Sequence, residues 1–136
     1  MSSRTRLFLV AAVAVVALVV TAAALALSGL TYNKTAQLSV SRTAATVTGS
    51  VTCTPTDVTV NVFVQLLQGK GRQILIGTGS ETQACPAGGG TISWTVTATT
   101  SQGQTYQPGS ATVFVSAGNF DFSSNPTVTG PIKLSS

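Results

Sequence analysis

The chain has 136 residues, enough for one small domain, and 7% of them are charged, against about 25% in a typical soluble domain. Histidine is absent, which excludes Ser-His-Asp catalysis and removes the commonest metal ligand, so we expect no enzyme, no bound metal and no cofactor. The few basic residues are scattered along the chain, and we therefore expect no nucleic-acid partner.

The N-terminal segment, residues 1–28, is predicted to be a signal peptide or a transmembrane anchor. Arg4 and Arg6 precede an apolar run of 21 residues, 7–27, which ends among small residues. A basic start, an apolar middle and a small-residue exit are typical of a secretory signal. The run also reaches the roughly 20 residues that cross a bilayer, so it is long enough to be retained as a hydrophobic helix. Either way the domain is expected outside the cell, and membrane contact is expected only through residues 7–27 and only if this run is not cleaved.

The next segment, residues 29–36, is expected to be a short linker. From residue 37 apolar and polar residues alternate with the period of two that half-buried strands show. The predicted domain is 37–118, followed by a C-terminal tail at 119–136. Strands are predicted at 37–41, 46–54, 57–68, 72–78, 91–99 and 110–117, with a weaker strand or loop at 79–85.

Within the longest predicted strand, 57–68, one face is formed by valines and a leucine at every second position, which we assign to the core. This inner face consists of Val58, Val60, Val62, Val64 and Leu66. Glycines at 69–71 predict a turn, and the glycine run at 88–90 predicts a break. About seven short strands without a periodic helix after residue 30 favour a two-sheet antiparallel sandwich, with a small barrel as the alternative.

Cys53 and Cys85 are the two cysteines of the chain, and both follow the export signal. A disulfide between them is expected, because bonds of this kind persist outside the cell. The alternative is a reactive or metal-binding thiol pair. That alternative lacks both a CxxC spacing and a nearby histidine.

Several aromatic residues are candidates for a binding surface. Trp94 alternates with apolar neighbours and is assigned to the core. Phe63 and Phe114 lie opposite the main apolar faces of their strands, so together with Tyr106 they are the predicted binding residues. The alternative is that another strand or the tail covers the two phenylalanines.

The chain resembles the small secreted domains of unknown function found in actinobacteria. The resemblance is carried by the segments 48–53, 64–65 and 108–113, by Cys85 before a glycine-rich turn, and by Trp94. It implies an immunoglobulin-like sandwich with one disulfide. It brings no activity and no catalytic residues.

The sequence as a whole predicts an exported, disulfide-stapled β-domain with a non-catalytic binding or structural role at the cell surface or outside the cell. Its partner, extracellular or in the envelope, is not specified by any motif. The alternative is a membrane-anchored subunit of an envelope assembly. A hydrolase would have to use the acidic residues Asp57, Glu81 and Asp121, which are far apart in the sequence.

Overall fold

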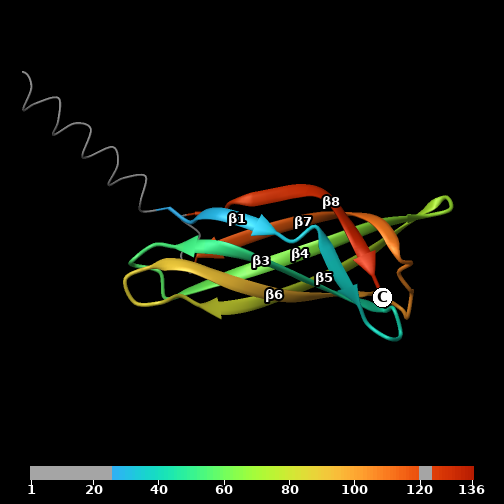
Figure 1. Ribbon diagram of the computed structural model, residues 1–136, viewed down its shortest axis with the longest axis horizontal. Helices are drawn as coiled ribbons and strands as arrows, with labels where there is room; N and C mark the ends of the chain where they lie inside the picture. The colour runs from blue at the N-terminus through green and yellow to red at the C-terminus, as the bar shows by residue number, and fades with distance from the viewer. Residues whose placement is uncertain (1–25, 120–123) are drawn as a thin grey trace, which may run out of the picture.

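The computed structural model describes residues 26–119 and 124–136, which form an all-β structure (Figure 1). The signal or anchor helix expected at 1–28 falls almost wholly outside these residues. Within the described ranges no helix has the length and hydropathy needed to span a bilayer. The strands are β1 (Ser28–Tyr32), β2 (Thr35–Leu38), β3 (Ala44–Cys53), β4 (Thr59–Lys70), β5 (Gln73–Ala84), β6 (Gly90–Thr100), β7 (Gly109–Asn119) and β8 (Thr127–Ser135).

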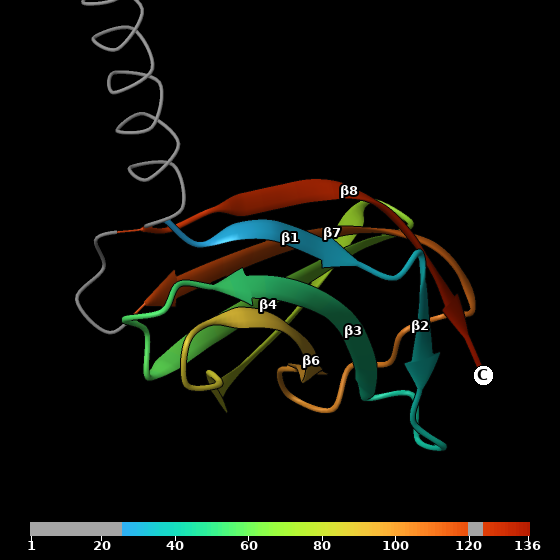
Figure 2. The same cartoon turned by 60° about the vertical axis from the view of Figure 1, so that its left-hand side comes forward.

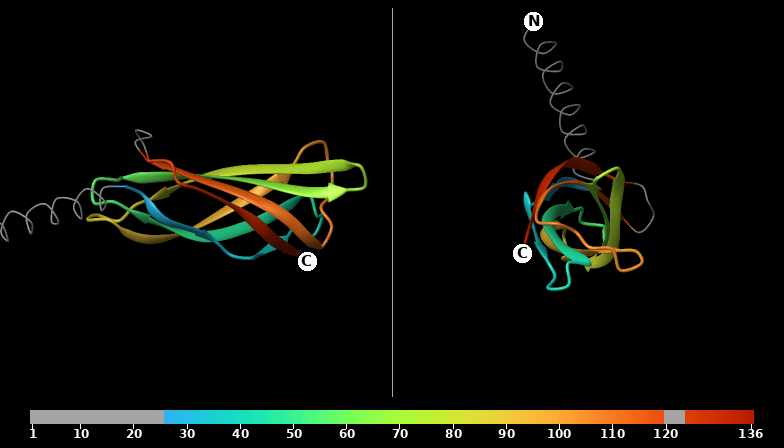
Figure 3. Two further views of the ribbon diagram at one scale, coloured as in Figure 1. Left: turned by 90° about the horizontal axis from the view of Figure 1, so that it is seen from above. Right: turned by 90° about the vertical axis from the view of Figure 1, so that its right-hand side faces the viewer.

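The strands form one sheet that closes on itself, and the predicted two-sheet immunoglobulin-like sandwich is therefore wrong. Neighbouring strands follow the order β3-β2-β8-β7-β4-β5-β6, and β6 pairs again with β3, which gives a barrel of seven strands. The end-on view in Figure 3 shows the strands arranged around a closed core. Alternating apolar residues give a strand one buried face in either architecture, so the period alone does not reveal whether the outermost strands meet.

Two short contacts complete the barrel. On one side β2 pairs in parallel with β8, with Ala36 opposite Leu134, and the backbone N–H of Lys133 donates to the carbonyl of Lys34 at 2.8 Å. On the other side β5 and β6 pair through Gly77 and Thr78 alone. The remaining ladders are antiparallel, and the longest join β4 to β5 and β3 to β6.

Two strands, β1 and β8, and the first half of β2 come from segments that the pattern placed outside the domain; the second half of β2 overlaps the strand predicted at 37–41. The expected linker contributes to β1 and β2, where Ala36 is buried, and β1 lies along β3 beside β8 (Figure 2). The expected tail contributes β8, whose buried Ile132 and Leu134 continue an alternation that begins at Val128. Pro131 lies at an exposed position of this alternation, and its carbonyl accepts a hydrogen bond from the hydroxyl of Tyr32 on β1 at 3.0 Å. Among the described strands β8 forms no ladder with β1, so a proline is tolerated on this edge.

The strand β4 confirms the predicted alternation except at its start. Val60, Val62, Val64 and Leu66 are fully buried, whereas Val58 precedes the strand and is 76% exposed. β4 continues two residues beyond its expected end, to Lys70, and the turn is formed by Gly71 and Arg72. The φ of Gly71, +64°, is what a tight two-residue hairpin of type II′ requires at its first central position.

The barrel interior is filled mainly by valines around Trp94, which is 1% exposed and confirms the core assignment. The indole N–H of Trp94 donates to the carbonyl of Ser50 at 3.2 Å. Gly49 lies against this ring, and a Cβ at that position would meet the indole carbons at 2.4 Å. The core is therefore packed around one large side chain that needs a glycine opposite it.

The predicted disulfide is confirmed. Cys53, the last residue of β3, is bonded to Cys85, which directly follows β5, with the two Cα atoms 6.0 Å apart. The bond joins strands that are not neighbours in the sheet. It therefore ties together two sides of the barrel at one of its ends.

Removing this bond, by replacing both Cys53 and Cys85 with alanine, is expected to lower the free energy of unfolding by roughly 3–4 kcal/mol, because the bond closes a long loop in the unfolded chain. Urea denaturation of the variant measures the loss. The wild type unfolded in excess dithiothreitol is the control and should give the same midpoint. A midpoint equal to that of the oxidised wild type would contradict the stabilising role.

The β5–β6 contact yields a second prediction. A Cβ at Gly77 would lie 1.6 Å from the hydroxyl oxygen of Tyr106, whereas nothing lies within 4 Å of one at Gly69. Gly77→Ala is expected to cost about 1–3 kcal/mol of stability through overpacking, and Gly69→Ala is expected to stay within about 0.5 kcal/mol of the wild type. Adding Tyr106→Phe to Gly77→Ala should restore part of the loss. Stability is measured by urea denaturation. Equal urea midpoints for Gly77→Ala and Gly69→Ala would contradict the close packing of Gly77 against Tyr106.

Candidate functional site

The structure brings two of the three predicted binding residues together on the outside of the barrel. Phe63 on β4 and Phe114 on β7 point away from the core, because the residues on either side of each are buried. Gln65 lies opposite Phe114 in the β4–β7 ladder, so the two phenylalanines are diagonal neighbours on one face. Phe63 is 38% exposed and Phe114 is half-buried, so neither the tail nor another strand covers this face completely.

Three further apolar side chains extend this face. Leu67 is half-buried on β4 and pairs with Ile76 on β5, and Ile74 lies one diagonal step further toward the hairpin tip. Ile74 is 67% and Ile76 44% exposed. We call these five residues the outer apolar patch: Phe63, Leu67, Ile74, Ile76 and Phe114.

Alternation in the sequence puts Ile74 and Ile76 on the same face of β5, but it does not tell which face is inward. In β5 the inward residue is Leu75, which is 4% exposed, so the two isoleucines on either side of it point outward. The signal that distinguishes them is the pairing of Leu75 with the buried Gln68. That pairing depends on the register of the hairpin and is not visible in β5 alone.

Tyr106 does not contribute to any surface, because its side chain is fully buried in the barrel. Its backbone N–H donates to the carbonyl of Arg42 at 2.8 Å, and its hydroxyl donates to the carbonyl of Ala98 at 3.4 Å. Burial raises the pKa of the Tyr106 phenol to about 12. The residue therefore anchors the loop before β7 to the core, which corrects its assignment as a binding residue.

A buried amide, which the sequence analysis did not single out, holds the same loop from the other side. The side-chain N–H of Gln68 donates to the carbonyl of Gln107 at 2.8 Å, and its oxygen accepts from the backbone N–H of Gln107 at 2.8 Å. Gln68 is 7% exposed, so these bonds satisfy a polar group taken out of water. A lone glutamine in an alternating strand gives no sequence signal for this role.

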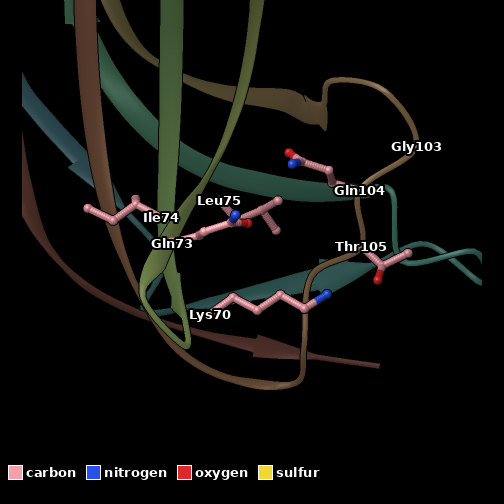
Figure 4. Close-up of a pocket in the computed structure, with 7 residues that line it drawn as sticks. All are labelled: Lys70, Gln73, Ile74, Leu75, Gly103, Gln104 and Thr105. Carbon is pink, nitrogen blue, oxygen red and sulfur yellow. The ribbon is translucent and has the colours of Figure 1, made fainter.

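The loop and the β4–β5 hairpin enclose a hollow of about 260 Å³ (Figure 4). Lys70 reaches from the hairpin toward the loop that carries Gln104 and Thr105, and Leu75 forms part of the apolar wall. The polar groups that line this hollow are side-chain amides, a hydroxyl and one ammonium group, and none of them is a carboxylate. This lining suits a small neutral or anionic molecule, and it contains no nucleophile paired with a base.

The acidic residues do not form a catalytic or metal-binding group in the described part of the chain. Asp57 accepts hydrogen bonds from the backbone N–H of Thr54 at 2.8 Å and from its hydroxyl at 2.9 Å, so it fixes the turn after β3. Glu81 is exposed on β5, and Asp121 lies outside the described residues. Within the described ranges no three histidine, cysteine or acidic residues gather as metal ligands would.

Comparison of the chain with protein-family models gives no match, and comparison with curated proteins gives none either. The function is therefore inferred from the residues and contacts described above.

The buried phenol of Tyr106 predicts a loss of stability at high pH. Its raised pKa means that the folded protein keeps the proton while the unfolded chain releases it near pH 10, so the stabilisation is complete below about pH 10 and is lost as pH rises toward about 12. The expected loss is up to about 2–3 kcal/mol over that window. The loss is measured as the decrease in the urea midpoint between about pH 8 and about pH 11.

Tyr106→Phe is the control for this prediction. It removes the titrating group but keeps the ring, and the hydroxyl contact that it deletes is long, so the variant should remain close to the wild type at neutral pH. At high pH its midpoint should fall less than that of the wild type. Parallel decreases in both proteins would contradict a buried, protonated phenol.

Proposed function

We propose that the protein is an exported, disulfide-stapled β-barrel that acts by binding rather than by catalysis, at the cell surface or outside the cell. The contact surface is the outer apolar patch of β4, β5 and β7. The partner is an extracellular or envelope component. The alternative retains residues 7–27 as an anchor and makes the domain a displayed subunit of an envelope assembly.

The observation that carries the proposal is the outer apolar patch. Its five side chains are contiguous in the registers of β4–β5 and β4–β7, and they lie on a molecule whose surface is otherwise rich in threonine and serine. Contiguous exposed apolar groups on a soluble surface mark interaction sites, because water solvates them poorly. Their position on paired strands gives them a fixed arrangement, which suits recognition.

Export is supported by the disulfide and by the N-terminal sequence. A structural disulfide indicates an oxidising compartment. The basic and apolar start of the chain is what a secretory signal requires. A relationship to the small secreted actinobacterial domains rests only on the short sequence resemblance. The sandwich fold that this resemblance implies is not retained in the proposal, because the sheet is a closed barrel.

The binding proposal is tested on insoluble envelope material from an exporting host, with purified protein added and the retained fraction measured. Replacing Phe63 and Ile76 by threonine keeps the strand preference and removes two exposed apolar side chains. Retention should fall by about tenfold or more, since each such side chain contributes about 1.5–3 kcal/mol when fully buried at an interface.

Val58→Thr is the matched control, because Val58 is exposed but lies outside the patch. It should leave retention unchanged. Wild-type protein that is not retained, or equal retention of the patch variant and the wild type, would contradict the proposed surface.

Intact mass of the supernatant and membrane fractions distinguishes the two forms of the proposal. A released species shorter than the full chain supports a cleaved signal, and a full-length species confined to the membrane supports the anchored subunit. A full-length species retained in the cytoplasm would contradict export.

A further inference from the structure

The outward side of the β3–β6 ladder carries four successive residue pairs in which both residues have a hydroxyl group. In the β3–β6 ladder each outward residue of one strand lies directly opposite a hydroxyl residue of the other. We call these eight residues the hydroxyl ladder: Thr46 with Thr97, Thr48 with Thr95, Ser50 with Ser93, and Thr52 with Thr91. The inward residues between them, such as Val47 and Val96, are fully buried and hold the two strands against the core.

The hydroxyl ladder contains no charge and no aromatic group. Neither β3 nor β6 has a charged residue, and the aromatic residue of these strands, Trp94, points into the core. The hollows at the β4–β5 hairpin and along β8 are lined by other residues. Among the described residues, these two strands therefore present an uncharged outer face without an aromatic side chain.

Three of the four residues in the β3 half of the ladder make side-chain hydrogen bonds. The hydroxyls of Thr31 and Ser50 are 2.7 Å apart, those of Thr52 and Thr91 are 2.8 Å apart, and the amide of Asn33 donates to Thr48. The side chains of the β6 half are exposed. Within the described residues, Ser93, Thr95 and Thr97 make no side-chain hydrogen bond, so these hydroxyls are directed to solvent.

These groups repeat along each strand, and the two strands set one spacing across the face. Outward residues recur about every 6.6–6.8 Å along a strand, and neighbouring strands lie about 4.7–4.9 Å apart. A threonine side chain is stiff at χ1 because it is branched at Cβ, so each one presents its methyl and hydroxyl groups in few orientations. Such a surface orders a layer of water with a repeat of its own, in which the hydroxyls hydrogen-bond and the methyl groups are surrounded.

We propose that the hydroxyl ladder is an ice-binding face. Ice presents rows of water molecules whose hydrogen bonds repeat over distances of this order, and a neutral, regular array of methyl and hydroxyl groups matches such rows without disturbing them by charge. The proposal involves a different surface from the outer apolar patch, and it does not depend on the function proposed above.

The test uses the full chain expressed in an exporting host and recovered in whatever form that host produces. Fluorescently labelled protein is placed around a growing ice crystal, and the fraction incorporated into ice is compared with that in the liquid. Retardation of recrystallisation in a polycrystalline ice film is the second measurement. The wild type is expected to enter the ice and to slow recrystallisation.

The variant Thr95→Lys/Thr97→Lys places two charges in the exposed column of the ladder. The incorporated fraction should fall by about tenfold or more. The matched control Thr82→Lys/Thr112→Lys makes the same change at exposed positions on β5 and β7 and should behave as the wild type. Circular dichroism and the urea midpoint establish that both variants fold.

Three results would overturn the proposal. The wild type could be excluded from ice as an inert protein of similar size is, or both lysine variants could lose incorporation equally. The wild type could instead bind an insoluble polysaccharide through the same threonines while being excluded from ice, which would reassign the face to a carbohydrate surface. Loss of incorporation confined to Thr95→Lys/Thr97→Lys supports the proposal.

Discussion

Closure of the sheet is the constraint on which the rest of this structure depends, and it passes through the short strand β2. Four residues, Thr35–Leu38, pair with β3 on one side and with β8 on the other, so they join the beginning of the chain to its last strand. Without that junction, β3 at Ala45 and Thr46 and β8 at its C-terminal end would lose a partner strand, and the barrel would open along an unpaired edge, which is a hazard for aggregation. A second short closure joins β5 to β6 at Gly77 and Thr78, and there Tyr106 fills the space that a side chain at position 77 would need.

A closed barrel divides every strand into one buried and one exposed column, and the two columns have different chemistry here. The buried columns are mostly valine and leucine, packed around Trp94 and Tyr106. The exposed columns are mostly threonine and serine, and they carry few charges that would repel other molecules. The outside therefore differs from face to face by the distribution of apolar and hydroxyl groups rather than by charge.

The order of strands around the barrel gives the two proposed surfaces different strands. The outer apolar patch lies on β4, β5 and β7, and the hydroxyl ladder lies on β3 and β6, with β5 and β6 as the neighbours where the two arcs of the ring meet. The disulfide joins the end of β3 to the end of β5, so it fixes the two faces relative to each other at one end of the molecule. The β4–β5 hairpin reaches the opposite end of the barrel from the start of β1 (Figure 3).

The sequence by itself determined the features that depend on local pattern or on counting. These are the strands β3, β4, β6 and β7, the buried face Val60–Leu66, and the disulfide, which has a single possible pairing among two cysteines. The tertiary structure decided what depends on partners distant in the chain. It brought 29–36 and 127–135 into the sheet, closed that sheet into a barrel, buried Tyr106 and turned Ile74 and Ile76 outward. The physical reason is that a period of two shows which residues share a face, whereas the side of that face and the neighbours of the strand are set by register between strands.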